Sequence, residues 1–143
     1  MAITSAICTS FKVEILKGIH NFTASSGDTF KLALYTSSAS LGAGTTAYTT
    51  SNEVSGSGYT AKGNALTSVT PVADSTTAVC DFADTSFTSA SFTARGCLIF
   101  NDSASGDPAV CAIDFGGDKT VSSGTFTIQF PAAAASTAIV RIA

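Results

Sequence analysis

The sequence predicts a mainly β fold, an antiparallel β-sandwich or barrel of the jelly-roll or immunoglobulin-like kind, with one short N-terminal helix. Short apolar segments recur along the chain, and Gly, Pro, Asp or Ser bounds each of them. A βαβ fold would need helical patterns between such segments. At 143 residues the chain has the size of one domain. We therefore expect a single β domain over residues 11–143.

The first ten residues are small and largely apolar, which predicts an arm over residues 1–10 that reaches a partner. A short helix is expected next. Phe11, Ile15, Leu16 and Ile19 fall on one helical stripe, with Thr9 or Ser10 as the N-cap. The stripe suits either the core or an exposed interface, and periodicity does not distinguish between them.

The segment TFKLALYTS alternates two sets of residues, which predicts a half-buried strand with Phe30, Leu32 and Leu34 on one face and Lys31, Ala33 and Tyr35 on the other. Residues 37–63 are rich in Gly, Ser, Thr and Asn, with Tyr48 and Tyr59 as isolated aromatic anchors. A loop of this length in a compact domain is usually functional or contacts a partner. It is therefore the expected interaction surface.

Further strands are expected in ALTSVTPVAD, TTAVCDFAD, SFTARGCLIFND, PAVCAIDFGG, TVSSGTFTIQF and TAIVRIA. NDSASGD is the loop of the clearest hairpin. Phe is plentiful and Trp is absent, so Phe should dominate the core. The expected core residues are Phe30, Phe82, Phe100, Phe115, Phe126 and Phe130.

The composition argues against several classes of function. Charged residues make up only 12% of the chain, which favours packing against neighbours over free diffusion. The net charge is −3 and there is no run of Lys or Arg, so no nucleic-acid partner is expected. No stretch approaches the roughly 20 apolar residues of a membrane-spanning helix, and the N-terminus lacks the pattern of a signal peptide.

Side chains suited to catalysis are few: ten acids, seven bases and one His are spread along the chain. His20 is expected to form a structural hydrogen bond, because no nucleophile motif accompanies it. We therefore expect no enzyme and no cofactor. The carboxylate pairs Asp81/Asp84 and Asp114/Asp118 suit turn capping, with a Ca²⁺ site as the alternative.

Four cysteines form neither a CxxC pair nor a ligand set with the single His. Buried free thiols are the expectation, and no bound metal is expected. A cross-strand disulfide between Cys97 and Cys111 remains open.

The order of several segments resembles a family of small, mostly uncharacterised proteins encoded among the structural genes of tailed bacteriophages. ALYTSS, TAYTTSNEVSGSGYTAKG and DFGGDKTVSSGTFTIQFP carry the resemblance, which covers nearly the whole chain. It implies a virion protein assembled in the host cytoplasm, without catalytic residues. The expected function is capsid decoration, as a cement protein that binds the major capsid protein, as a homo-oligomer and most simply a trimer.

Two other functions stay open: a tail, neck or fibre component, and a glycan-binding β-sandwich that would stack sugars on Tyr35, Tyr48 or Tyr59. Aromatic and apolar anchors usually dominate the energy of an interface. The candidate interface residues are Ala2, Ile3, Ile7, Phe11, Ile15, Ile19, Tyr48 and Tyr59.

Overall fold

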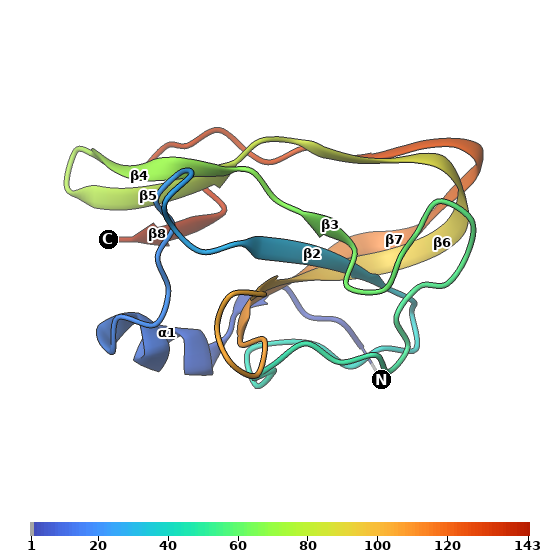
Figure 1. Cartoon of the computed structure of the whole chain (residues 1–143), viewed down its shortest axis with the longest axis horizontal. Helices are drawn as coiled ribbons and strands as arrows, with labels where there is room; N and C mark the ends of the chain where they lie inside the picture. Colours follow the sequence, from blue (N-terminus) through green and yellow to red (C-terminus); the bar gives the residue numbers. More distant parts are fainter. Residues whose placement is uncertain (1) are drawn as a thin grey trace.

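The computed structural model describes residues 2–143 and shows two antiparallel sheets with one short helix (Figure 1). The elements in chain order are β1 (Ala6–Ile7), α1 (Thr9–Leu16), β2 (Phe30–Tyr35), β3 (Asn64–Ala65), β4 (Ser68–Asp74), β5 (Thr77–Phe82), β6 (Thr85–Asn101), β7 (Ala109–Ile128) and β8 (Val140–Ile142). The predicted antiparallel sandwich is confirmed. The barrel alternative is not observed, because the two sheets stay separate.

The five-stranded sheet has the order β1-β7-β6-β2-β3, and the three-stranded sheet has the order β4-β5-β8. Two long strands, β6 and β7, form one hairpin. The half that is farther from the turn, made by the start of β6 and the end of β7, bends away from the rest of the larger sheet (Figure 1). Register shifts interrupt the hairpin, including one between Ala94 and Gly96, and such bulges bend a strand pair. Two predicted segments, PAVCAIDFGG and TVSSGTFTIQF, are thus parts of one strand.

The second strand, β2, is more buried than its alternating pattern predicted. Ala33 and Tyr35, expected on a solvent face, are fully buried. The reason is the loop of residues 37–63, which covers that face. Val54 N donates to Leu34 O at 2.9 Å, and the Tyr35 hydroxyl donates to Thr49 O at 2.7 Å.

The short helix α1 begins earlier than expected and ends before Ile19. Cys8 occupies the N-cap position and its side chain makes no capping hydrogen bond to the helix, so neither Thr9 nor Ser10 is the N-cap. Gly18 ends it with a φ of 71°, a left-handed conformation that glycine adopts without strain. No helix among residues 2–143 has the length and apolarity needed to cross a membrane.

The expected arm is part of the domain rather than a free extension. Residues 6 and 7 pair with Ala112 and Cys111 of β7, and Ile3 bridges to Leu41. Ile3 is only 7% exposed. Its side chain occupies the space that Gly96 leaves open, because a Cβ on Gly96 would lie 2.8 Å from Ile3 Cδ1. The arm therefore completes the sheet edge of its own chain.

Candidate functional site

An apolar groove lies between the two sheets and has a volume of about 1010 Å³. Residues of β1 and the start of β7 line one side. The end of β7, the segment that follows it and β8 line the other. The apolar side chains of the lining include Ile7, Phe115, Phe126, Ile128 and Phe130. A groove of this volume falls in the range that binds ligands or partner segments.

The groove divides the predicted aromatic core. Phe30, Phe82 and Phe100 are buried as expected. Phe115, Phe126 and Phe130 instead line the groove and are only partly buried, although they pack against the core cluster. Aromatic residues bury large areas when their surroundings are complete. This part of the core is therefore incomplete within the single chain.

Two basic side chains, Lys119 and Arg141, are the charged groups among the residues that line the groove. Both residues are exposed. Arg141 Nη1 donates one hydrogen bond to Ala135 O at 2.8 Å. Within residues 2–143, neither side chain forms an ion pair. The groove thus combines an apolar lining with positive charge.

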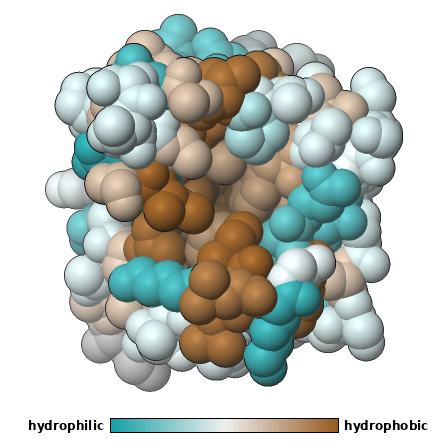
Figure 2. Space-filling view, turned by 90° about the vertical axis from the view of Figure 1, so that its left-hand side faces the viewer, coloured by the Kyte–Doolittle hydropathy of each residue, from teal (hydrophilic) through white to brown (hydrophobic). Residues whose placement is uncertain are grey.

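Large hydrophobic side chains are also exposed on α1, on the segment just after it, and on β4 and β8. Leu16 is 89% exposed and Val72 is 59% exposed. The others are Val13, Ile19, Val69 and Ile142. Figure 2 views the end of the molecule that carries α1 and β8, and shows hydrophobic residues gathered around a hollow. Apolar side chains therefore gather at this end of the molecule.

The structure divides the candidate interface residues of the N-terminal region. Ala2 and Ile19 are exposed, Ile7 lines the groove, and Ile15 is partly buried. Ile3, like Phe11, belongs to the core.

Phe11 is 3% exposed and packs against other aromatic rings, with its centroid 4.9 Å from that of His20 and 5.9 Å from that of Phe22. The helical stripe therefore faces the core at Phe11, whereas Ile19 lies on the apolar end.

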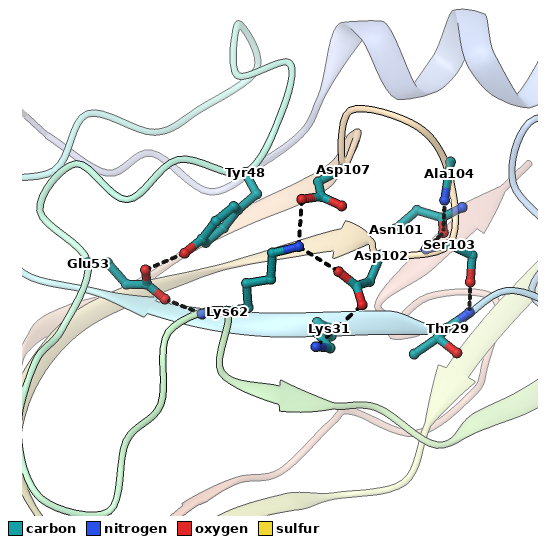
Figure 3. Close-up of polar contacts among 10 residues, drawn as sticks. All are labelled: Thr29, Lys31, Tyr48, Glu53, Lys62, Asn101, Asp102, Ser103, Ala104 and Asp107. Carbon is teal, nitrogen blue, oxygen red and sulfur yellow. Dashed lines mark hydrogen bonds and ion pairs between the residues drawn. The ribbon is translucent and has the colours of Figure 1, made fainter.

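The tyrosine anchors of the loop point inward, to a carboxylate that sequence reasoning missed. Glu53 accepts hydrogen bonds from the Tyr48 hydroxyl at 2.6 Å and from Lys62 N at 2.7 Å (Figure 3). It also accepts a hydrogen bond from the Tyr59 hydroxyl at 2.6 Å. The Tyr59 hydroxyl also accepts from Leu34 N at 2.9 Å. Tyr48 and Tyr59 therefore hold the loop to the sheet rather than standing out as anchors for a partner.

Burial and the hydrogen bond to Glu53 affect the tyrosine hydroxyls. Burial, followed by the Glu53 contact, raises the pKa of Tyr48 to about 12. The same two causes raise the pKa of Tyr59 well above its usual range. Both hydroxyls stay protonated at neutral pH and act as donors to the carboxylate.

A second part of this network connects the loop to the turn between β6 and β7. Lys62 Nζ lies 2.9 Å from Asp102 Oδ1 and 2.8 Å from Asp107 Oδ2 (Figure 3). Lys31 Nζ lies 3.3 Å from Asp102 Oδ2. The bond from Lys62 holds the pKa of Asp102 below its usual range, and the two aspartates raise that of Lys62. Glu53 and Lys62 thus hold the loop at two positions, the first through the tyrosine hydroxyls and the second through the two aspartates.

The single histidine has a structural setting. His20 Nε2 lies 3.0 Å from Glu14 Oε1, and His20 Nδ1 lies 3.1 Å from Asn101 Nδ2. The Asn101 amide also donates to Asp28 Oδ2 at 2.8 Å. His20 is 7% exposed and Asn101 is fully buried. These contacts join α1, the segment before β2 and the end of β6.

All four cysteines are free, and Cys8, Cys97 and Cys111 are buried. Cys97 is paired in register with Ile113, and Cys111 with Ile99, so the two thiols are not cross-strand partners. Burial raises the pKa of Cys8 to about 11 and that of Cys111 to about 12. These thiols are therefore poor nucleophiles at neutral pH.

The carboxylate pairs have partners within the chain. Asp81 accepts from Phe82 N, Asp84 from Phe130 N, and Asp114 from Gly116 N. Asp118 pairs with Arg95 Nε at 3.0 Å. Among residues 2–143 no cluster of three or more His, Cys, Asp or Glu side chains suits a metal ion. Asp81 and Asp84 lie at the turn between β5 and β6, as expected, whereas Asp114 and Asp118 lie within β7 rather than at a turn.

The spacing of Phe126, Ile128 and Phe130 in the sequence is that of one face of a strand, but this spacing does not reveal that the face borders a groove. Lys119 and Arg141 belong to no recognisable sequence motif, and only the tertiary structure brings them to the same site. Glu53 lies between the two tyrosines in the sequence, and that spacing was the available signal. No protein-family model, curated protein or solved structure matches the chain.

Proposed function

We propose that this chain is a non-enzymatic structural protein of a tailed-phage particle that decorates the capsid and binds between shell subunits. The apolar groove, with exposed apolar side chains on α1, β4 and β8, is the observation that carries the proposal. Soluble monomers rarely leave large contiguous apolar patches uncovered. The resemblance of the sequence to small phage structural proteins supports a particle as the place where this surface is covered.

The stabilising effect would follow from mass action. A protein that binds the assembled shell but not the disrupted one stabilises it by RT ln(1 + [L]/Kd) at each site. The proposed partner is the major capsid protein, and a homotrimer at three-fold or quasi-three-fold positions is the simplest arrangement. Many modest contacts would then add over the whole shell.

The polar network of the loop supports an assembly role as well. Glu53 and Lys62 hold residues 37–63 against the sheet through the contacts described above. A surface that is ordered before binding loses less conformational entropy when a partner docks. The domain thus offers a preformed shape to its neighbours.

The two alternative functions differ in how they use these features. A glycan-binding surface would need exposed aromatic rings, but Tyr35 is fully buried and the hydroxyls of Tyr48 and Tyr59 are bonded to Glu53. A tail, neck or fibre component would use the same apolar surface as a decoration protein. Copy number separates these two positions.

The test is quantitative mass spectrometry of purified particles of the phage that encodes the chain. Capsid decoration predicts a copy number close to that of the major capsid protein. A ring of about six to twelve copies would instead assign the chain to the neck or tail. Absence from the particle would refute a virion function.

A further inference from the structure

We infer that the groove binds an extended segment of another protein, which pairs as an added strand with the free edge of β7 and directs a carboxylate to Lys119 or Arg141. This mode of binding deepens the proposed function and rests on it, because the partner is expected on the phage particle.

The edge of β7 is only partly covered. On one side β7 pairs with β6 from Ala109 to Ile128, and on the other β1 pairs with it at Cys111 and Ala112. Ser5 Oγ accepts from Asp114 N at 2.8 Å, and Asp114 Oδ1 accepts from Gly116 N at 3.0 Å. Beyond these contacts no strand among residues 2–143 covers this edge. Such an edge is a template for an added strand.

Side chains of the same strand supply the apolar contacts. Phe126 and Ile128 alternate along β7, and Phe130 continues the period. All three line the groove and are partly buried. An added strand would place alternate side chains among them, because strand side chains repeat with a period of two residues. An extended segment with alternate apolar residues therefore fits both the edge and the groove.

The charge of the groove favours a partner segment that carries acidic residues. The groove has positive charge from Lys119 and Arg141 and no acidic residue in its lining. Two apolar segments of this chain, AITSAIC and TAIVRIA, contain no Asp or Glu. Both are already paired within the chain, the first with β7 and the second, as β8, with β5. A segment of a different chain that carries Asp or Glu is thus the occupant that the charges favour.

The inference can be tested with synthetic peptides and the purified full chain. The probe is a fluorescein-labelled peptide DVTITVTID, and the matched probe KVTITVTIK reverses its end charges. We expect the acidic peptide to bind roughly three- to ten-fold more tightly at low salt, with the preference shrinking as salt is added. The double substitution Lys119→Glu and Arg141→Glu should invert the preference. Both residues are exposed, and thermal unfolding would verify that this variant folds.

Strand pairing is tested separately from charge. A peptide DVTIPVTID lacks one backbone donor and should bind more weakly if the peptide pairs along the edge. Hydrogen exchange should show new protection at alternate amides of residues 117–128 when DVTITVTID binds. Binding without that protection, equal binding of both charged peptides, or no binding at millimolar concentration would overturn the inference. Protection that rises with protein concentration alone would overturn it in favour of a second copy.

Failure here differs from failure of the proposed function. Absence of the chain from purified particles would refute the virion role even if the peptide binds. Failure of the peptide, with the chain abundant on particles, would leave decoration in place and reject only this mode of contact.

Discussion

At the scale of single residues, one amide determines how the histidine is bonded. Asn101 Oδ1 accepts from the backbone N–H groups of Ser103 and Ala104, at 2.9 and 3.2 Å. Its Nδ2 therefore supplies the donors to Asp28 and to His20 Nδ1. The His20 ring proton must then lie on Nε2, where it is donated to Glu14. A fully satisfied polar network of this kind specifies one arrangement of the core.

Replacing Asn101 by Ala should destabilise the fold by about 2–4 kcal/mol, because several buried groups would lose their partners together. Urea unfolding followed by circular dichroism measures the change. Asn21→Ala is the matched control: Asn21 is exposed and its side chain accepts one bond, from Thr23 N. A similar loss of unfolding free energy in both variants would show that the Asn101 hydrogen bonds are not especially important for stability.

Replacing Glu53 by Gln should lower the pKa of Tyr48 from about 12 toward its ordinary value of 10, because a neutral amide no longer opposes ionisation of the hydroxyl. Burial remains, so the pKa should stay above 10. The raised pKa contributes stability that is present below pH 10 and is lost as the pH rises from 10 to about 12. Spectrophotometric tyrosine titration measures the shift, and an unchanged titration curve would reject the Glu53 contact.

At the scale of elements, close backbone packing limits which residues the turns accept. Gly63 precedes β3 with a φ of 69°, and a Cβ there would overlap the carbonyl oxygen of Leu32. Gly106 lies in the turn between β6 and β7 with a φ of 84°, and a Cβ there would meet nothing within 4 Å. The two glycines share a left-handed backbone but differ in their surroundings.

The comparison of Gly63→Ala with Gly106→Ala separates the two effects. Gly106→Ala should cost only the left-handed strain, about 1–2 kcal/mol. Gly63→Ala should cost more, because β2 and β3 would also have to move apart. Thermal unfolding of both variants measures the difference. Equal destabilisation would show that the contact with Leu32 is readily relieved.

At the scale of the whole molecule, polar and apolar contacts are unevenly distributed. The loop of residues 37–63 is fixed by Glu53 and Lys62, whereas apolar side chains remain uncovered on α1, β4 and β8. The groove opens between the two sheets. Polar contacts therefore order the loop, whereas the apolar side chains on α1, β4 and β8 stay exposed in the single chain.

Leu16→Lys tests the uncovered end. Because Leu16 is 89% exposed, the free energy of unfolding should change by less than about 0.5 kcal/mol. Self-association or attachment to particles should weaken, as measured by sedimentation velocity and by copy number on particles. Thr88→Lys, at another exposed position, is the control and should leave both unchanged. Equal binding by Leu16→Lys would exclude this end from the interface.

The local features of the fold follow from patterns of neighbouring residues in the sequence. Alternation of apolar residues predicted β2 and the strands of the long hairpin, and NDSASGD predicted its turn, because these patterns depend on neighbours along the chain. The stripe of α1 was also visible, although its cap and its end were not. Phe30, Phe82 and Phe100 lie in the core as expected.

The remaining features depend on contacts between distant parts of the chain. The place of Ile3 depends on the gap at Gly96, and the inward turn of Tyr48 and Tyr59 depends on Glu53. The groove exists because the sheets are not closed along the edge of β7. Such features join residues far apart in the chain, and periodicity carries no information about which distant segment will cover a given face.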